Sequence, residues 1–474
     1  MIFNSIEFLI FFPIVTAIHF LLPKRWRWLL LLIASCVFYM AFIPAYILVL
    51  FFTIIIDYAA GIMIEKSDGR KRKMYLLASL FGNISVLAIF KYYNFFIDNI
   101  NAVIQSSGLS SHQISDLGLI LPIGLSFHTF QAMSYTIDVY KGNQKAERHF
   151  GIYSLYVMFF PQLVAGPIER ARQMLPQFHN PKEFDYPSVV IGLRYILYGL
   201  FKKVVIADNL SKLVDEVYNH SNDYTGISLA VATVFFAIQI YCDFSGYSDI
   251  AVGTARVLGY DLMQNFRTPY ISSSLREFWQ RWHISLSTWF RDYLYIPLGG
   301  NRTTTIKKYF NLFITFLVSG FWHGANWTFV IWGAIHGVGM IIENFLSYRL
   351  PFKIPSFFRH VLTFIVVCFA WIFFRAKSIK DAGTIIANLN GNWHLQSLSG
   401  LFLKVYYSPT FVSILLSISL VFLLLETRLQ YNDINFAFEK RSRFTRWSLY
   451  YLMLLIIVFV GLNDNAPNFI YFKF

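Results

Sequence analysis

The segment from Arg276 to Arg291 combines an imidazole, hydroxyl groups and guanidinium groups within a sequence rich in aromatic residues. If the segment is one continuous helix, His283, Ser287 and Arg291 recur every four residues on one face, with Arg276 and Gln280 close to the same stripe. An imidazole in line with a hydroxyl and a cation has the groups needed to move a proton and to bind an anion. The alternative interpretation is an interfacial amphipathic helix with tryptophan anchors and snorkelling arginines.

His323 is a second candidate, because it follows the uncharged run 311–321 and lies between Gly320 and Gly324. An ionisable side chain in such an apolar setting is expensive, so it is usually functional or firmly paired. His336 follows 13 residues later, which is about 220° around a straight helix. Either the helix breaks near residues 324–326, or His336 has a different role. A hydrogen-bonded structural histidine is the alternative for each.

Two other apolar segments carry polar side chains. Residues 239–260 contain Asp243, Asp249 and Arg256, and we expect a structural polar network in which Asp249 pairs with Arg256. A cation-coupled transporter would also place aspartates there. Residues 122–142 contain His128, which we expect to be structural, in the wall of a cavity.

Composition predicts an integral membrane protein. Of the 474 residues, 56% are hydrophobic and only 14% are charged, whereas a soluble protein carries about 25% charged residues. We therefore expect an all-α polytopic membrane fold, with residues 1–474 forming a single integral membrane domain. The net charge of +14 lies in short loops between apolar runs, so nucleic-acid binding is not expected. The three cysteines are far apart and predict neither a disulfide framework nor a metal site.

The distribution of Lys and Arg predicts the topology. The first apolar run, 6–22, lacks a preceding basic region and is followed by basic residues, which predicts an uncleaved helix with an external N-terminus. Residues 65–73 and 439–446 are expected in the cytoplasm, and 98–117, which lack Lys and Arg, outside it. The run 151–166 should be a broken or re-entrant helix, because Pro161, Gly166 and Pro167 interrupt its end. Residues 376–407 are expected to form a loop with short surface helices.

Five motifs resemble those of the bacterial membrane-bound O-acyltransferases. The resemblance is strongest to the membrane subunits of alginate and peptidoglycan O-acetylation and weaker to the D-alanyl transferase of teichoic acid modification. It extends from the N-terminus to at least Arg375. The motifs are RWHISLSTWFRDYLYIPLGGNR, FWHGANWTFVIWGAIHG, PIGLSFHTFQAMSYTIDVYKG, VAGPIER and YCDFSGYSDIAVG.

This resemblance implies a ring of about ten to twelve transmembrane helices, some broken or re-entrant, around a central reaction chamber. It implies that His323 of the WHG motif is catalytic and that His283 is the other signature residue. It also implies acetyl-CoA as a cytoplasmic donor substrate, with no bound cofactor or metal. The acetyl group would cross the bacterial cytoplasmic (inner) membrane, reach a partner extracytoplasmic acetyltransferase and finally modify a polysaccharide.

We expect His323 to deprotonate the acceptor hydroxyl, and His283 to orient the acyl carbonyl or stabilise its developing charge. Basic cytoplasmic residues are expected to attract the phosphates of coenzyme A. The remaining residues expected to contact donor or acceptor are Arg276, Gln280, Ser287, Arg291, Trp322, Asn326 and His336.

Two other functions are alternatives to acetyl transfer. Transfer of another acyl group, D-alanyl or fatty acyl, would differ in the width of the donor tunnel. A transporter or channel would require inverted repeats or paired broken helices in the two halves, and the sequence contains no such repeat. The motifs do not specify the polysaccharide, which is alginate, peptidoglycan or another exopolysaccharide.

Overall fold

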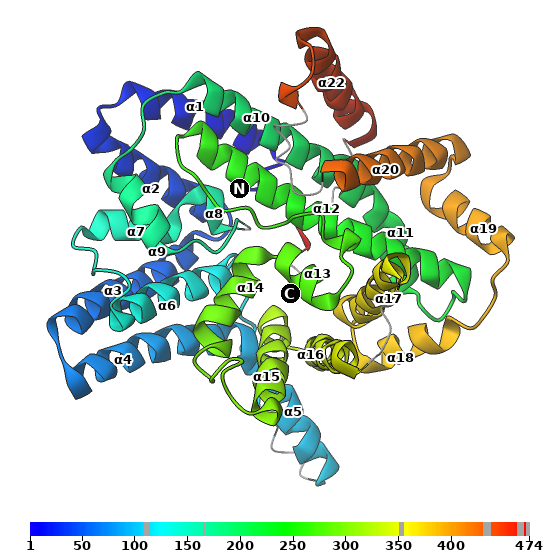
Figure 1. Cartoon of the computed structure of the whole chain (residues 1–474), viewed down its shortest axis with the longest axis horizontal. Helices are drawn as coiled ribbons and strands as arrows, with labels where there is room; N and C mark the ends of the chain where they lie inside the picture. The colour runs from blue at the N-terminus through cyan, green and yellow to red at the C-terminus, as the bar shows by residue number, and fades with distance from the viewer. Residues whose placement is uncertain (109–112, 165, 350–354, 430–437, 462–468, 471–474) are drawn as a thin grey trace. The chain divides into compact units, whose positions relative to one another are not determined.

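The computed structural model describes residues 1–108, 113–164, 166–349, 355–429, 438–461 and 469–470. Within these ranges every regular element is a helix, as the composition predicts (Figure 1). The chain forms two compact units. Unit 1 comprises residues 1–192 and 254–263, and unit 2 comprises residues 193–253 and 264–474.

Unit 1 is built mainly from the N-terminal helices. Residues 69–106 are helical throughout, because a π-helical turn at Ala88–Tyr92 joins α4 to α5. The run expected to be broken is broken: α7 ends at Met158, Phe159 is non-helical and the short α8 follows. The helices are α1 (Ile6–Leu21), α2 (Lys24–Met40), α3 (Ile47–Lys66), α4 (Gly69–Leu87), α5 (Tyr93–Ser106), α6 (Leu125–Lys141), α7 (Phe150–Met158), α8 (Phe160–Leu163) and α9 (Ala171–His179).

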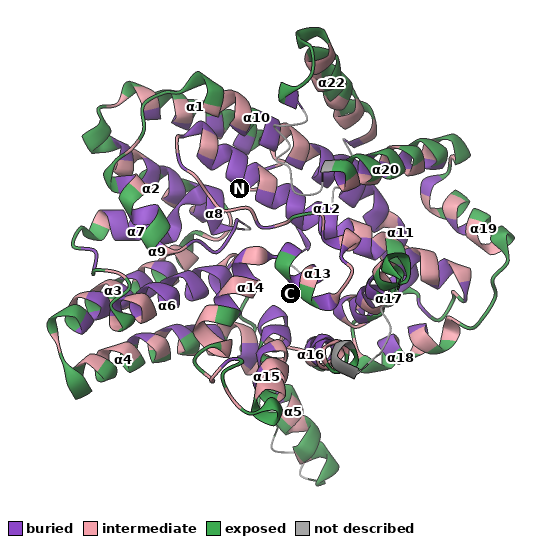
Figure 2. Ribbon diagram, in the orientation of Figure 1, coloured by how far each residue is buried: buried purple, intermediate pink, exposed green. Residues whose placement is uncertain are grey.

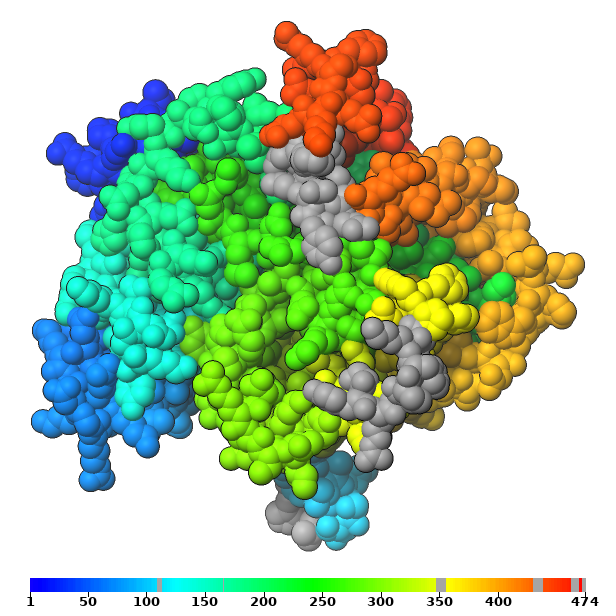
Figure 3. Space-filling view, in the orientation of Figure 1, coloured from blue at the N-terminus to red at the C-terminus, as the bar shows by residue number. Residues whose placement is uncertain are grey.

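Unit 2 holds the remaining helices. The chain enters it along α10 (Tyr186–Leu200), and α12 (Ile227–Val257) is buried along most of its length (Figure 2). In contrast, α22 (Arg443–Ile456) buries none of its residues and stands at the surface in Figure 3. The others are α11 (Asp208–Asn219), α13 (Leu275–Arg281), α14 (Ile284–Phe290), α15 (Thr305–His323), α16 (Trp327–Arg349), α17 (Ser356–Arg375), α18 (Ile379–Asn388), α19 (Leu395–Tyr406) and α20 (Pro409–Leu429). Here α18 and α19 are the short helices expected within 376–407.

Among the described residues, seven helical stretches are long and apolar enough to cross a membrane. The protein is therefore a multi-pass membrane protein. The expected count of about ten to twelve included shorter apolar segments such as α1, α2 and α6, which have 16, 17 and 17 residues. A span across a hydrocarbon core of about 30 Å needs about 20 residues, so these helices are at the lower limit of spanning length.

The basic loops of unit 1 lie together on one face. Arg148 forms an ion pair with Glu65, and the rings of Trp28 and His149 lie 4.6 Å apart. Loops distant in sequence thus meet at one end of the unit, here called the basic face. Residues 69–106 form a 38-residue helix, about 57 Å long at 1.5 Å per residue. A helix of this length is long enough to cross a hydrocarbon core of about 30 Å.

Two buried lysines on a π-helical turn, 201–207, hold parts of unit 2 together. Lys202 pairs with Asp249 at 3.0 Å and with Glu426 at 2.9 Å. Lys203 pairs with Asp208 and Asp243, both at 2.7 Å. The structural network expected around 239–260 is therefore present. The expected pairing within it is wrong, because Asp249 pairs with Lys202, and Arg256 pairs with Asp261.

Candidate functional site

The helix expected to carry the first histidine bends sharply at that residue. Helix α13 ends at Arg281, Trp282 is extended, and His283 has a left-handed φ of 43° before α14 begins. The expected straight stripe through His283, Ser287 and Arg291 is therefore wrong, because the three side chains do not belong to one continuous helix. A left-handed residue that is not glycine is strained and persists only where its surroundings fix it.

Asn265, from the segment preceding α13, fixes this bend. Its backbone carbonyl accepts from the Ile284 N–H at 2.9 Å, and its side-chain Oδ1 accepts from the Ser285 N–H at 3.2 Å. The same Oδ1 accepts from the Ser285 hydroxyl at 3.0 Å and lies 3.1 Å from Nδ1 of His283. Helix α14 has no side-chain cap at its own N-cap position, so Asn265 supplies the acceptors for its first N–H groups.

These contacts determine the tautomer of His283. A backbone N–H can only donate, so the atom of Asn265 that faces Ser285 must be the oxygen. The Nδ1 atom of His283, facing the same oxygen, must then carry a hydrogen, which leaves a lone pair on Nε2 of the neutral ring. His283 is fully buried and lies outside the seven apolar spans, and this burial lowers its pKa to about 3. Its imidazole is therefore neutral near pH 7.

His323 is the last residue of α15, at a break between two antiparallel helices. Gly324 is extended, and α16 begins three residues later at Trp327. Of the two alternatives for 323–336, the helix break is the correct one. The two helices approach each other so closely at Gly320 that a Cβ there would lie 2.3 Å from the backbone oxygen of Phe329. Small residues permit such contact between membrane helices.

The break brings His336 back toward His323 through a shared tryptophan. The indole of Trp332 lies 5.0 Å from each imidazole, measured between ring centroids. His336 is fully buried, and its Nδ1 accepts from the indole N–H of Trp279 at 3.3 Å. In its neutral form His336 therefore carries its hydrogen on Nε2, the opposite tautomer from His283. Ring contacts lead from His323 to His283 through Trp332, Trp371, Trp282 and Phe266.

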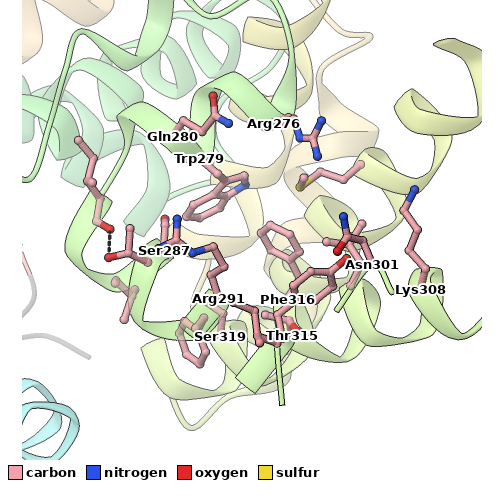
Figure 4. Close-up of a pocket in the computed structure, with 18 of the residues that line it drawn as sticks. Arg276, Trp279, Gln280, Ser287, Arg291, Asn301, Lys308, Thr315, Phe316 and Ser319 are labelled. Carbon is pink, nitrogen blue, oxygen red and sulfur yellow. Dashed lines mark hydrogen bonds between the residues drawn. The ribbon is translucent and has the colours of Figure 1, made fainter. Parts of the chain in front are cut away.

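A cavity of about 690 Å³ lies against this aromatic cluster (Figure 4). Trp279 forms part of its wall and contacts His336 through the hydrogen bond above. Ser319, also in the wall, lies on α15 one turn before His323. Its cationic lining residues are Arg276, Arg291 and Lys308, and none of the described residues that line it is a carboxylate. The cavity thus combines an apolar wall with positive charge, which suits an anionic ligand that has an apolar part.

The expected substrate-contacting residues fall into two groups. Four of them, Arg276, Gln280, Ser287 and Arg291, line this cavity together, although the helix carrying them is bent. Trp322, His323, Asn326, His336 and His283 are not among its lining residues. The amide of Asn326 donates to the Lys377 carbonyl at 3.1 Å and accepts from the Thr328 N–H at 3.0 Å. These bonds give Asn326 a clear structural role at the start of α16.

Sequence reasoning missed four residues of this region. Lys308 and Ser319 line the cavity, Trp332 lies between two histidines, and Asn265 holds His283. The spacing from Ser319 to His323, one helical turn, was a signal that could have identified the serine. Asn265 lies 18 residues before its partner, and no local pattern marks it.

Comparison with known proteins gives a consistent family match. Residues 148–380 match the membrane-bound O-acyltransferase family. The probable alginate O-acetylase AlgI of Pseudomonas aeruginosa is 40% identical over 404 residues, covering 84% of this chain and 77% of that protein. The peptidoglycan O-acetyltransferase of Helicobacter pylori is 34% identical over 500 residues, covering 96% and 92%. The teichoic acid D-alanyltransferase of Streptococcus thermophilus is 31% identical over 238 residues, covering 47% and 56%.

Proposed function

Because the chain belongs to the membrane-bound O-acyltransferase family and is an O-acyltransferase, we propose that it moves an acetyl group from cytoplasmic acetyl-CoA toward an extracytoplasmic polysaccharide. The polysaccharide would be alginate, peptidoglycan or another exopolysaccharide. The protein would lie in the bacterial cytoplasmic membrane and deliver the acetyl group to a partner acetyltransferase outside it.

One observation carries the choice of acetyl over D-alanyl. The similarity to a peptidoglycan O-acetyltransferase covers 96% of this chain, whereas that to a D-alanyltransferase covers 47%. Transfer of D-alanyl or a fatty acyl group is the second candidate, supported by that shorter similarity. The charged lining of the cavity supports a phosphate-bearing donor, because Arg276, Arg291 and Lys308 could each bind phosphate oxygens.

In this mechanism the imidazole of His323 accepts the proton of the acceptor hydroxyl as its oxygen attacks the thioester carbonyl. The new C–O bond forms, the C–S bond breaks, and the proton passes to the departing thiolate. His283 would accept a hydrogen bond from another donor group of a substrate, since its neutral Nε2 has a lone pair and cannot donate a hydrogen bond to an acyl oxygen. Trp332 would keep His323 and His336 in fixed positions, because both rings pack against it.

Transfer from radiolabelled acetyl-CoA in membranes tests the proposal, with D-alanyl and long-chain acyl donors as parallel arms. His323→Ala should lower the acetyl transfer rate about 10²- to 10⁴-fold, the usual contribution of a general base. His394→Ala is a matched control, since His394 is exposed and far along the chain. A well-inserted His323→Ala protein with the wild-type rate would reject the mechanism. Faster transfer from a D-alanyl or long-chain donor would replace acetyl as the transferred group.

A further inference from the structure

Unit 1 contains a second cavity, of about 320 Å³, on its basic face. The first turn of α2 supplies Lys24, Arg25 and Trp28, and the end of α9 supplies His179. Within the described part of the chain, no carboxylate lines this cavity. It belongs to unit 1, whereas the candidate acyl-transfer site belongs to unit 2. The mechanism above assigns it no role.

The positive charge of this cavity is only partly balanced by neighbouring groups. Lys24 pairs with Glu183 at 2.8 Å, and His179 with Glu147 at 2.8 Å. Among the residues that the structure describes, no carboxylate lies within ion-pairing distance of Arg25, whose guanidinium lies 5.7 Å from the ring of Trp26. The cavity therefore presents an exposed arginine with its charge available to an anion.

The wall of the cavity is aromatic and built with close packing. Trp28 packs against His149, and a Cβ at Gly151 would lie 2.2 Å from the Trp28 ring, so only glycine leaves room for this indole. Phe178 completes the apolar side. Tryptophan beside Lys and Arg is characteristic of the membrane–water interface, where the apolar ring and the cation can contact the same lipid molecule.

An exposed apolar stripe leads along α1 toward this cavity. Leu21, the last residue of α1, is 84% exposed and lies three residues before Lys24. The stripe repeats every three or four residues, so it occupies one helical face of a length suited to an acyl chain. Its exposed members are Ile6, Leu9, Ile10, Ile14, Ile18 and Leu21.

We infer that this cavity binds the phosphate head group of an anionic phospholipid, whose acyl chains lie along α1. The phosphate contacts Arg25 and Lys24, and the glycerol region lies against Trp28. The predicted topology would place the basic face in the cytoplasm, where anionic lipids are concentrated and basic pockets between helices bind their head groups. This site goes beyond the proposed acyl transfer and does not depend on it.

Native mass spectrometry of the full chain in mild detergent, titrated with phosphatidylglycerol or phosphatidylcholine, tests the inference. The wild type should retain phosphatidylglycerol in preference to phosphatidylcholine. Each basic residue near an anionic lipid contributes about fivefold to binding, so Lys24→Gln with Arg25→Gln should weaken retention about 30-fold. Arg25→Gln alone should weaken phosphatidylglycerol retention about fivefold. Because this variant leaves the Lys24–Glu183 ion pair intact, a loss of retention is not attributed to misfolding.

The matched control is Arg70→Gln with Lys71→Gln, which removes the same charge from exposed positions of the basic face outside the cavity. Retention should be unchanged in this control. Equal weakening in both double variants would mean general surface attraction and would overturn the site. A third arm adds glycerol 3-phosphate: if it competes at concentrations similar to the lipid, the ligand is a soluble phosphate ester and the lipid assignment is wrong.

Discussion

Replacing Asn265 by leucine should remove the group that sets the tautomer of His283. Leucine is similar in size but offers no acceptor, so the Ser285 N–H and the His283 Nδ1–H both lose their partner. The Ser285 hydroxyl can rotate toward another acceptor, so it is left out of the estimate. Each buried donor without a partner costs about 1–3 kcal/mol, which gives about 2–6 kcal/mol for the two fixed donors.

The His283 ring can avoid part of this cost by turning to another orientation or shifting to the other tautomer, so both changes become more favourable. If His283 holds a donor group of a substrate through Nε2, Asn265→Leu should lower kcat for acetyl transfer by at least about 10²-fold, within the range expected for acid–base groups. The change in KM should be smaller, because Asn265 does not line the cavity. Initial rates in membranes, at varied acetyl-CoA and with protein amounts matched, measure both constants.

Asn265→Asp is the informative companion, because its carboxylate can still accept from all three donors. The Nδ2 of Asn265 has no hydrogen-bond partner among the described residues, so replacing this amide nitrogen by a carboxylate oxygen breaks no hydrogen bond. Its negative charge favours the imidazolium and raises the pKa of His283, so the acid limb of the pH–rate profile should move to higher pH. Wild-type kcat in a stable Asn265→Leu variant, or an unmoved acid limb in Asn265→Asp, would refute the reasoning.

Three other predictions concern the donor, acidity and topology. Arg276→Gln or Arg291→Gln should raise KM for acetyl-CoA about tenfold or more, because a hydrogen bond to a charged group contributes about 1.5–3 kcal/mol; steady-state kinetics measure this, and an unchanged KM in both would remove the donor from the cavity. Folded His283 stays neutral to about pH 3 whereas its unfolded pKa is 6.5, so stability should fall as pH drops below 6.5, and melting temperatures at pH 7 and 5 should differ less in His283→Gln. A cysteine introduced at Lys71 should react with an impermeant reagent only from the cytoplasmic side, and one at Asn101 only from outside; labelling of both from one side contradicts the topology.

The sequence allowed the fold class and four of the cavity-lining residues to be predicted, because both depend on local pattern. Apolar runs of span length define membrane helices wherever they pack. Arg276, Gln280, Ser287 and Arg291 line one cavity because the bend at His283 still leaves these four side chains on a common side. Their grouping therefore survived an incorrect assumption about the helix.

The bend itself could not be predicted, because its cause is tertiary. No proline or glycine lies between Arg276 and Arg291 to signal a break. The bend exists because Asn265 supplies acceptors for the N–H groups that an uninterrupted helix would satisfy internally. The position of His336 was ambiguous for the opposite reason: the glycine at 324 permitted a break, but only the packing of α15 on α16 determines that one occurs.

The ion pairs of Lys202 have a consequence for how far the protein can be shortened. The segment that matches the family ends at residue 380, yet one carboxylate on this buried lysine comes from Glu426 in α20. The hydroxyls of Tyr198 and Tyr241 donate to the same carboxylate at 2.7 and 2.6 Å. A chain truncated after 380 would leave Lys202 with Asp249 as its partner but two buried phenol hydroxyls without their acceptor, at a cost of about 1–3 kcal/mol for each hydroxyl. We therefore expect a chain that includes α20 to form a more stable unit 2 than the family segment alone.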